Sequence, residues 1–347
     1  MKNYFLSFGN PTNILEKMNY SFIKSFDKPF ENNNTNDYSN SKIILSIQLD
    51  AQGICIPLFE WFSKFDLINF KNSSAVIIVH SCSELFSKTI IQKCIFMLNQ
   101  KGCKFMGRPM VEATKSLNNF KTLQKVYNDT LENVCLKACE NLAKRFNNYT
   151  TTTLLNPNLL VLHASNYETS NTLALWHMVQ KNLCNVNINT IHIENGTVRD
   201  CKGCPYKTCS HYGKQNQCFY GGIMVEEIYP AVLDADAIMF ICPNYNDGIS
   251  ANLCAVINRL TALFRQTKFY DKNILGIIVS GSSGGDAIAK QLISALNCNK
   301  TFQLPPNAFL FATANDYGDI YKDKINEINA LRFANTINNN LSKIIKK

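Results

Sequence analysis

The chain has 347 residues, of which 46% are hydrophobic and 18% charged, and a formal net charge of +9. This is ordinary globular composition with length enough for two domains. The positive charge forms no compact cluster apart from Lys346–Lys347, which argues against nucleic-acid binding. No apolar run approaches eighteen residues and Met1–Phe5 leads into no signal peptide, so we expect no membrane span and a cytoplasmic protein.

Two polar stretches interrupt the apolar pattern in the first half of the chain. Residues 30–42 are rich in asparagine and predict a loop or a disordered connection. A long helical pattern at about 119–146 is followed by the polar run Asn147–Thr153. We place a domain boundary there, between residues 1–150 and 151–347.

The second half alternates between short apolar runs and helical patterns. We expect strands at 159–163, 186–193, 237–242, 274–280 and 308–313, and helices at 170–183, 224–233, 251–265, 286–296 and about 322–345. Uninterrupted apolar strands bracketed by helices predict a doubly wound α/β fold with a parallel sheet buried on both faces. Five strands that alternate with helices along the chain are typical of the flavodoxin-like strand order 2-1-3-4-5.

A faint repeat links the two halves. Gly53-Ile54 matches Gly248-Ile249, Ile77–Val79 matches Ile277–Val279, and Ala113-Thr114 matches Ala312-Thr313. Any two helix–strand runs could align by chance, but duplication is slightly favoured. We therefore interpret residues 1–150 as a reduced flavodoxin-like α/β domain without a flavin site.

Three loops follow strands of the second half, at residues 163–172, 243–250 and 280–286. The first leads into a helix N-terminus, whose unpaired N–H groups suit a phosphate, although Ser170 or Asn171 could simply cap that helix. The second combines Pro243, Tyr245 and Gly248, and the third holds three glycines; both are also compatible with ordinary turns. All three lie at the carboxyl ends of parallel strands, where open α/β sheets bind ligands.

Residues 158–315 resemble the NADPH-dependent FMN reductase and iron–sulfur flavoprotein family of the flavodoxin-like superfamily. The family's phosphate loop, Gly-Ser-x-Arg-x-x-Ser-Asn-Thr, is matched at Ser165, Ser170, Asn171 and Thr172, with Ala164 and Tyr167 in place of glycine and arginine. Its Ser-Pro-x-Tyr loop appears as Cys242–Tyr245, followed by Ser250 and Arg259.

The resemblance implies bound FMN, reduced by NAD(P)H or by a protein electron donor, and allows a homodimer. It places the FMN phosphate on the first loop and the isoalloxazine against the other two. The implied cofactor-binding residues are Ser165, Ser170, Asn171, Thr172, Pro243, Asn244, Tyr245, Asn246, Asp247, Gly248, Ser280, Gly281, Ser282, Gly284 and Gly285. It implies no catalytic side chain, because the cofactor supplies the hydride chemistry.

Four of the fourteen cysteines, Cys201, Cys204, Cys209 and Cys218, lie within one expected loop at 195–222. Four thiolates suit a [4Fe–4S] cluster, which family members hold at this place in the fold, but they also suit structural zinc or no metal. The other ten cysteines are interpreted as small buried hydrophobic residues. A flavin-dependent oxidoreductase is the leading hypothesis, and the alternative is a flavodoxin-like scaffold or binding module that has lost FMN.

Overall fold

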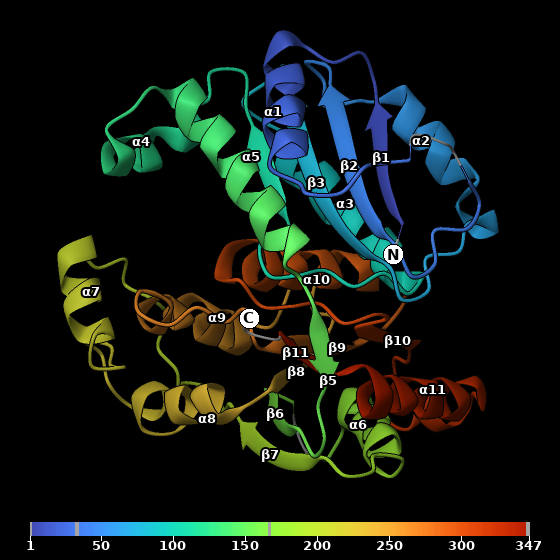
Figure 1. Cartoon of the computed structure of the whole chain (residues 1–347). Helices are drawn as coiled ribbons and strands as arrows, with labels where there is room; N and C mark the ends of the chain where they lie inside the picture. Colours follow the sequence, from blue (N-terminus) through green and yellow to red (C-terminus); the bar gives the residue numbers. More distant parts are fainter. Residues whose placement is uncertain (1, 32–34, 166–167, 345–347) are drawn as a thin grey trace. The chain divides into compact units, whose positions relative to one another are not determined.

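The structure is a computed structural model that describes residues 2–31, 35–165 and 168–344. The chain divides into two compact units, residues 1–150 and 151–347, with the boundary inside the polar run found in the sequence (Figure 1). Each unit is an α/β structure with its own parallel sheet. Among the described residues, no helix combines the length and the apolar character that crossing a membrane requires.

The first unit contains a four-stranded parallel sheet in the order β1-β2-β3-β4. Helices α1 and α5 pack against each other in front of this sheet, and α3 lies behind it (Figure 1). The long helix expected at 119–146 is divided in two at Asn128, which has a left-handed backbone. The elements of this unit are β1 (Asn3–Phe8), α1 (Asn13–Lys24), β2 (Lys42–Leu49), α2 (Ile56–Ser63), β3 (Ser74–Ser81), α3 (Ser87–Gln100), β4 (Met110–Ala113), α4 (Lys121–Tyr127) and α5 (Leu131–Asn147), with short 3-10 turns at Phe65–Leu67 and Asn118–Phe120.

The asparagine-rich segment expected to be a loop packs on the first unit where the structure describes it. Tyr38 is completely buried, and its ring stacks on Phe70 with centroids 5.5 Å apart. Its backbone N–H also donates to the Asn69 carbonyl at 2.8 Å. Of the two predicted alternatives, the described part of the segment is the loop, because one aromatic side chain anchors it to the core; Asn32 to Asn34 lie outside the described residues.

The second unit contains a five-stranded parallel sheet in the order β7-β6-β8-β9-β10, which is 2-1-3-4-5 when only the strands of this sheet are counted. Helices α6 and α11 pack against each other, as α1 and α5 do in the first unit. Its elements are β6 (Asn158–His163), α6 (Asn171–Gln180), β7 (Asn187–His192), α7 (Tyr206–Gly213), a π-helical turn (Met224–Ile228), α8 (Tyr229–Asp234), β8 (Ala237–Pro243), α9 (Ala251–Phe264), β9 (Asn273–Ser280), α10 (Gly285–Leu292), a second π-helical turn (Ile293–Cys298), β10 (Phe309–Thr313), a 3-10 turn (Asp319–Tyr321) and α11 (Ile325–Asn340).

A small two-stranded sheet in the second unit was not expected from the sequence. Residues Thr151–Thr153 form β5 and pair antiparallel with β11, Ser342–Ile344. The sequence analysis assigned the first segment to a polar linker and the second to the terminal helix. Neither segment carries an alternating apolar pattern, and their pairing joins residues far apart in the sequence.

The central strands are buried along their whole length. Every residue of β2, β3 and β9 is buried, whereas the edge strand β7 is largely exposed. Continuous apolar runs are typical of parallel strands that are covered by helices on both faces. The sequence expectation of a parallel α/β sheet is confirmed.

The two sheets share their register. We match β1, β2, β3 and β4 in turn to β6, β8, β9 and β10. Neighbouring strands of the first sheet then pair at Asn3–Lys42, Lys42–Ser74 and Ile77–Met110. The equivalent pairs in the second sheet are Leu159–Ala237, Ala237–Asn273 and Gly276–Phe309. This register aligns Ile78, and not Ile77, with Ile277. The one-residue difference matters because a shift by one reverses which face each side chain occupies. Strand β7 has no counterpart in the first sheet.

Candidate functional site

The three loops expected to bind a ligand all begin at the carboxyl edge of the second sheet. They follow β6, β8 and β9, whose parallel pairing places His163 beside Ile241 and Cys242 beside Ile278. A fourth loop, at 314–319, follows β10 at the same edge. The edge therefore gathers four loops, of which the sequence analysis identified three.

Asn244 joins the second loop to the third. Its side-chain amide donates to the Ser280 hydroxyl at 3.1 Å and to the Ser283 carbonyl at 2.9 Å. The same amide contacts Asp247 Oδ1 at 3.1 Å, and Asn244 Oδ1 accepts from the Asp247 N–H at 2.8 Å. The two loops predicted to hold a planar ring are therefore held together by one side chain.

The second loop is a tight turn that leaves an aromatic ring in solvent. Asn246 and Asp247 have φ values of 53° and 56°, and the Gly248 N–H donates to the Tyr245 carbonyl at 3.0 Å. Two consecutive left-handed residues closed by this bond form a type I′ turn. Tyr245 is 59% exposed, so its ring is available to stack on a ligand.

The glycines of the third loop are required by neighbouring protein atoms. A Cβ on Gly281 would lie 3.0 Å from Asn315 Oδ1, one on Gly285 would lie 2.9 Å from the Phe311 ring, and one on Gly284 would overlap Asp247. Gly284 is also the one of the three with a left-handed backbone, at φ 85°. Steric and backbone requirements within the protein thus account for these three glycines without a ligand. This agrees with the interpretation of the loop as an ordinary turn.

The first loop leads into α6 and is tied to the fourth loop. Ser170 caps α6 by accepting from the Leu173 N–H at 3.1 Å. Asn171 donates to the Asp316 carbonyl at 2.8 Å and accepts from the Gly318 N–H at 3.0 Å. These two side chains therefore serve the fold; Thr172 is buried beside them, and Tyr167, which replaces the family's arginine, lies outside the described residues.

Two buried hydroxyls at this edge have no hydrogen-bond partner among the described residues. They belong to Ser165, which is 2% exposed, and to Ser250, which is 8% exposed. Ser250 occupies the N-cap position of α9 but makes no capping bond. Because buried hydroxyls are rarely left unpaired, these two fit a polar ligand such as FMN at the edge. The sequence analysis did not include Ser250 among the cofactor-binding residues.

Two histidines stack at the carboxyl ends of β6 and β7. The rings of His163 and His192 are 4.6 Å apart and nearly parallel, at 11°. Burial, together with the neighbouring His192 and His177, lowers the pKa of His163 to about 4. His163 is consequently neutral at physiological pH beside the first loop.

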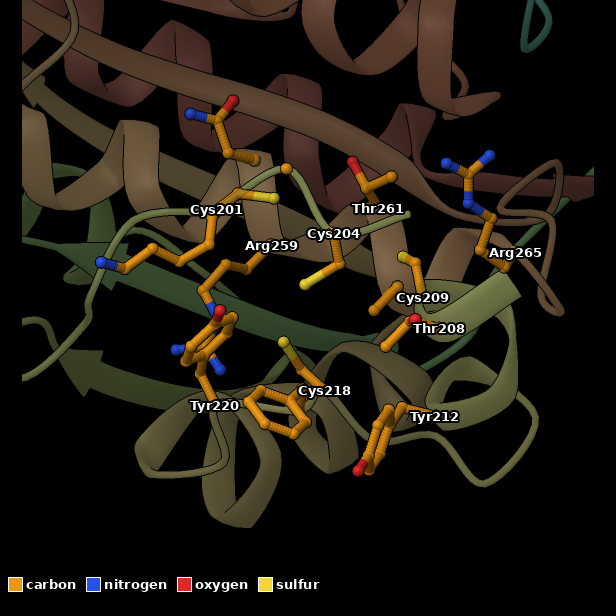
Figure 2. A pocket seen from close by; sticks show the side chains of 15 residues that line it. Cys201, Cys204, Thr208, Cys209, Tyr212, Cys218, Tyr220, Arg259, Thr261 and Arg265 are labelled. Carbon is orange, nitrogen blue, oxygen red and sulfur yellow. The ribbon is translucent and has the colours of Figure 1, made fainter. Parts of the chain in front are cut away.

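The cysteine-rich loop folds partly into a helix, α7, which packs on α9. Its four cysteines line one cavity of about 140 Å³ (Figure 2). Figure 2 shows the side chains of Cys201, Cys204 and Cys218 around the same space, with Cys209 on α7. In the part of the chain that the structure describes, no three His, Cys, Asp or Glu side chains are close enough to hold a single metal ion.

The remaining cysteines largely follow the expectation of small buried residues. Seven of these ten are buried, but Cys82 and Cys254 are partly exposed and Cys184 is exposed. Burial raises the pKa of the thiols of Cys94, Cys103 and Cys242, which keeps them protonated and unreactive.

The matching edge of the first unit is filled by its own side chains. Gln48 Oε1 accepts from the backbone N–H and the hydroxyl of Thr12, which precedes α1, at 3.1 and 2.9 Å. The side-chain amide nitrogen of Gln48 lies 3.0 Å from His80 Nδ1. The side chains of Thr12, Gln48 and His80 therefore occupy the start of α1, the helix that corresponds to α6.

The second unit is similar to a known family. Residues 157–316 match the NADPH-dependent FMN reductase family. The match begins at β6, contains the loops after β6, β8 and β9, and ends within the fourth loop. An iron–sulfur flavoprotein from Archaeoglobus fulgidus is 33% identical to this chain over 95 residues, 27% of the chain and 47% of that protein. The chain thus spans about half the length of this curated relative.

Solved structures with a similar arrangement include two reductases. The chain is similar to an NAD(P)H:quinone oxidoreductase from Methanothermobacter marburgensis, with 14% identity, 52% of this chain and 96% of that chain covered, and a TM-score of 0.41. It is also similar to an azoreductase from Bacillus anthracis, with 14% identity, coverage of 52% and 98%, and a TM-score of 0.37. The functional argument rests on the FMN reductase family match and on the geometry of the loops.

Proposed function

We propose that residues 151–347 bind FMN at the carboxyl edge of the five-stranded sheet and act as an NAD(P)H-dependent flavin oxidoreductase. The observation that carries the proposal is a pair of buried hydroxyls, those of Ser165 and Ser250. Both lie in the region that matches the FMN reductase family, and neither has a hydrogen-bond partner among the described residues. Bound FMN would accept a hydride from nicotinamide and pass its electrons to an acceptor.

The side chains of the site provide binding and orientation. Ser165 precedes α6, whose N-terminal N–H groups favour an anionic phosphate. Asn244 holds the second and third loops together, so that Tyr245 is presented on a rigid turn. We expect the ring of the cofactor to lie between Tyr245 and the loop that begins at Ser280. This arrangement orients the cofactor without a side-chain acid or base.

We also propose that Cys201, Cys204, Cys209 and Cys218 hold a [4Fe–4S] cluster. The four thiols line a shared cavity, yet no three of them converge as tightly as a single ion demands. Zinc binds four thiolates at about 2.3 Å, whereas each thiolate of a cluster binds a different iron and the sulfurs lie farther apart. The cavity therefore favours a cluster over zinc. A bound cluster would exchange single electrons with the flavin.

Flavin extraction and metal analysis of anaerobically purified protein test both proposals. We expect one FMN per chain, iron and sulfide in equal amounts, and loss of the flavin's visible absorbance when NADH or NADPH is added. A colourless protein that takes up no added FMN would support the scaffold alternative instead. Yellow protein without iron would retain the flavin proposal and refute the cluster.

Substitution of the two hydroxyls tests the location of the flavin. The double variant Ser165→Ala/Ser250→Ala should weaken FMN binding by about tenfold, which corresponds to about 1.4 kcal/mol. Ser294→Ala, in the helical turn that follows α10, is the matched control and should bind FMN like the unmodified protein. Equal affinity of both variants would place the cofactor elsewhere.

A further inference from the structure

A buried arginine lines the cysteine cavity. Arg259 lies on α9, is 3% exposed, and borders the same space as all four cysteines of the loop (Figure 2). Its Nη2 donates to the Gly221 carbonyl at 2.8 Å, which ties the end of the cysteine-rich loop to α9. The Tyr229 hydroxyl donates to the Arg259 backbone carbonyl at 2.6 Å and fixes that turn of the helix against α8.

The charge of Arg259 has no acidic counterpart. Among the described residues it forms no ion pair with a carboxylate, and its Nε has no hydrogen-bond partner. A guanidinium stays protonated at all accessible pH values, and burying such a charge without an opposite charge is costly. A negatively charged group bound in the cavity would therefore offset the charge of Arg259.

The groups that can supply this negative charge are the four cysteines. As thiolates they are anionic, and a cluster held by four thiolates keeps net negative charge. We infer that Arg259 is the counter-ion of the cluster proposed at Cys201, Cys204, Cys209 and Cys218, and that it raises the reduction potential of that cluster. This inference rests on the proposed cluster, whose presence is measured separately as the iron and sulfide content of the protein.

The redox consequence follows from the sign of the charge. One electron from a reductant such as dithionite enters the cluster and makes it more negative, while Arg259 neither gains nor loses a proton. A nearby positive charge stabilises the reduced form more than the oxidised form. Removing that charge should therefore make reduction less favourable.

Arg265 provides a matched comparison on the same helical segment. It follows α9 directly, lines the same cavity and carries the same charge, but it is exposed and its guanidinium lies 4.8 Å from the Tyr206 ring centroid. Solvent screens an exposed charge far better than a buried one. Arg265→Gln should thus have little effect where Arg259→Gln has a large one.

A redox titration of the iron-loaded protein is the first test. Arg259→Gln keeps a donor for Gly221 but removes the charge, and it should lower the equilibrium constant for one-electron reduction about tenfold, or about 59 mV. Arg259→Lys should stay within about threefold and Arg265→Gln within about twofold of the unmodified protein. An unchanged potential in Arg259→Gln, or an equal shift in Arg265→Gln, would overturn the inference.

The same titration of Arg259→Met is the second test, and it serves if Arg259→Gln does not fold, which circular dichroism checks. Methionine removes the charge while filling similar space, so the potential should again fall by about 59 mV. An unchanged potential in Arg259→Met would contradict the inference.

Discussion

Phe86 and Gly284 hold the same left-handed backbone position in the two units, each as the residue immediately before a helix, with φ values of 76° and 85°. The ring of Phe86 covers Gly53, where an added Cβ would overlap it. Gly53 corresponds in the repeat to Gly248 of the second loop. In the second unit, Asn244 and Asp247 connect these two loops. In the first unit, the aromatic side chain of Phe86 makes the equivalent contact.

Gly284 combines a left-handed backbone with a crowded Cβ position. Gly284→Ala should destabilise the protein by about 3 kcal/mol, from the left-handed backbone and from overlap with Asp247, and should weaken FMN binding at least tenfold. Gly318→Ala is the control, since Gly318 has the same φ of 85° and open space around it. It should cost only about 1–2 kcal/mol. Urea unfolding measures both, and equal costs would show that the contact with Asp247 is unimportant.

Asn244→Ala should separate the second and third loops. We expect a loss of about 1–2 kcal/mol in unfolding free energy, because the lost bonds are partly exposed, but a tenfold weaker FMN affinity. Asn187→Ala removes a comparable amide bond, to Asn158 at 3.0 Å, at the opposite edge of the sheet. Fluorescence titration with FMN should distinguish them; an equal loss of affinity in both variants would argue against a site at the carboxyl edge.

The sequence predicted the sheet well because its signal is local. Each buried strand is a continuous apolar run, and parallel strands joined by helices must place their carboxyl ends at one edge. This reasoning located the loops after β6, β8 and β9. The loop after β10 was not predicted. Its Asn315 lies beside Gly281, and its Asp316 carbonyl accepts a hydrogen bond from Asn171. Only the folded sheet brings these residues together.

Side-chain roles within the loops were harder to predict. Ser170, Ser250 and Asn171 are all plausible helix caps by sequence, yet Ser170 caps, Ser250 does not, and Asn171 bridges two loops. Which hydroxyl is left without a partner depends on distances between segments that are remote in the chain. The cysteine cavity shows the same limit, because Arg259 enters it from a helix about forty residues after the cysteine-rich loop.

Cys204→Ala should remove the cluster while leaving the flavin in place. With three thiolates remaining, we expect iron content to fall below about a third of the unmodified level and the brown colour to disappear, because a [4Fe–4S] centre requires its four ligands. Cys184→Ala replaces an exposed cysteine outside the loop and should retain full iron. Iron and FMN analysis of both proteins is the measurement. If Cys204→Ala kept its iron, the assignment of the four ligands would be wrong.

Acid should destabilise the protein through His163. Burial lowers its pKa from 6.5 to about 4 in the folded chain, so between these values the unfolded chain binds a proton that the folded chain does not. The free energy of unfolding therefore falls as the pH drops from about 6.5 to about 4, by about 3 kcal/mol from this group. His163→Phe keeps a ring to stack on His192 but cannot titrate, so its unfolding free energy should depend less steeply on pH in that window. Urea unfolding at a series of pH values compares the two proteins, and identical slopes for the unmodified protein and His163→Phe would exclude His163 as the group responsible.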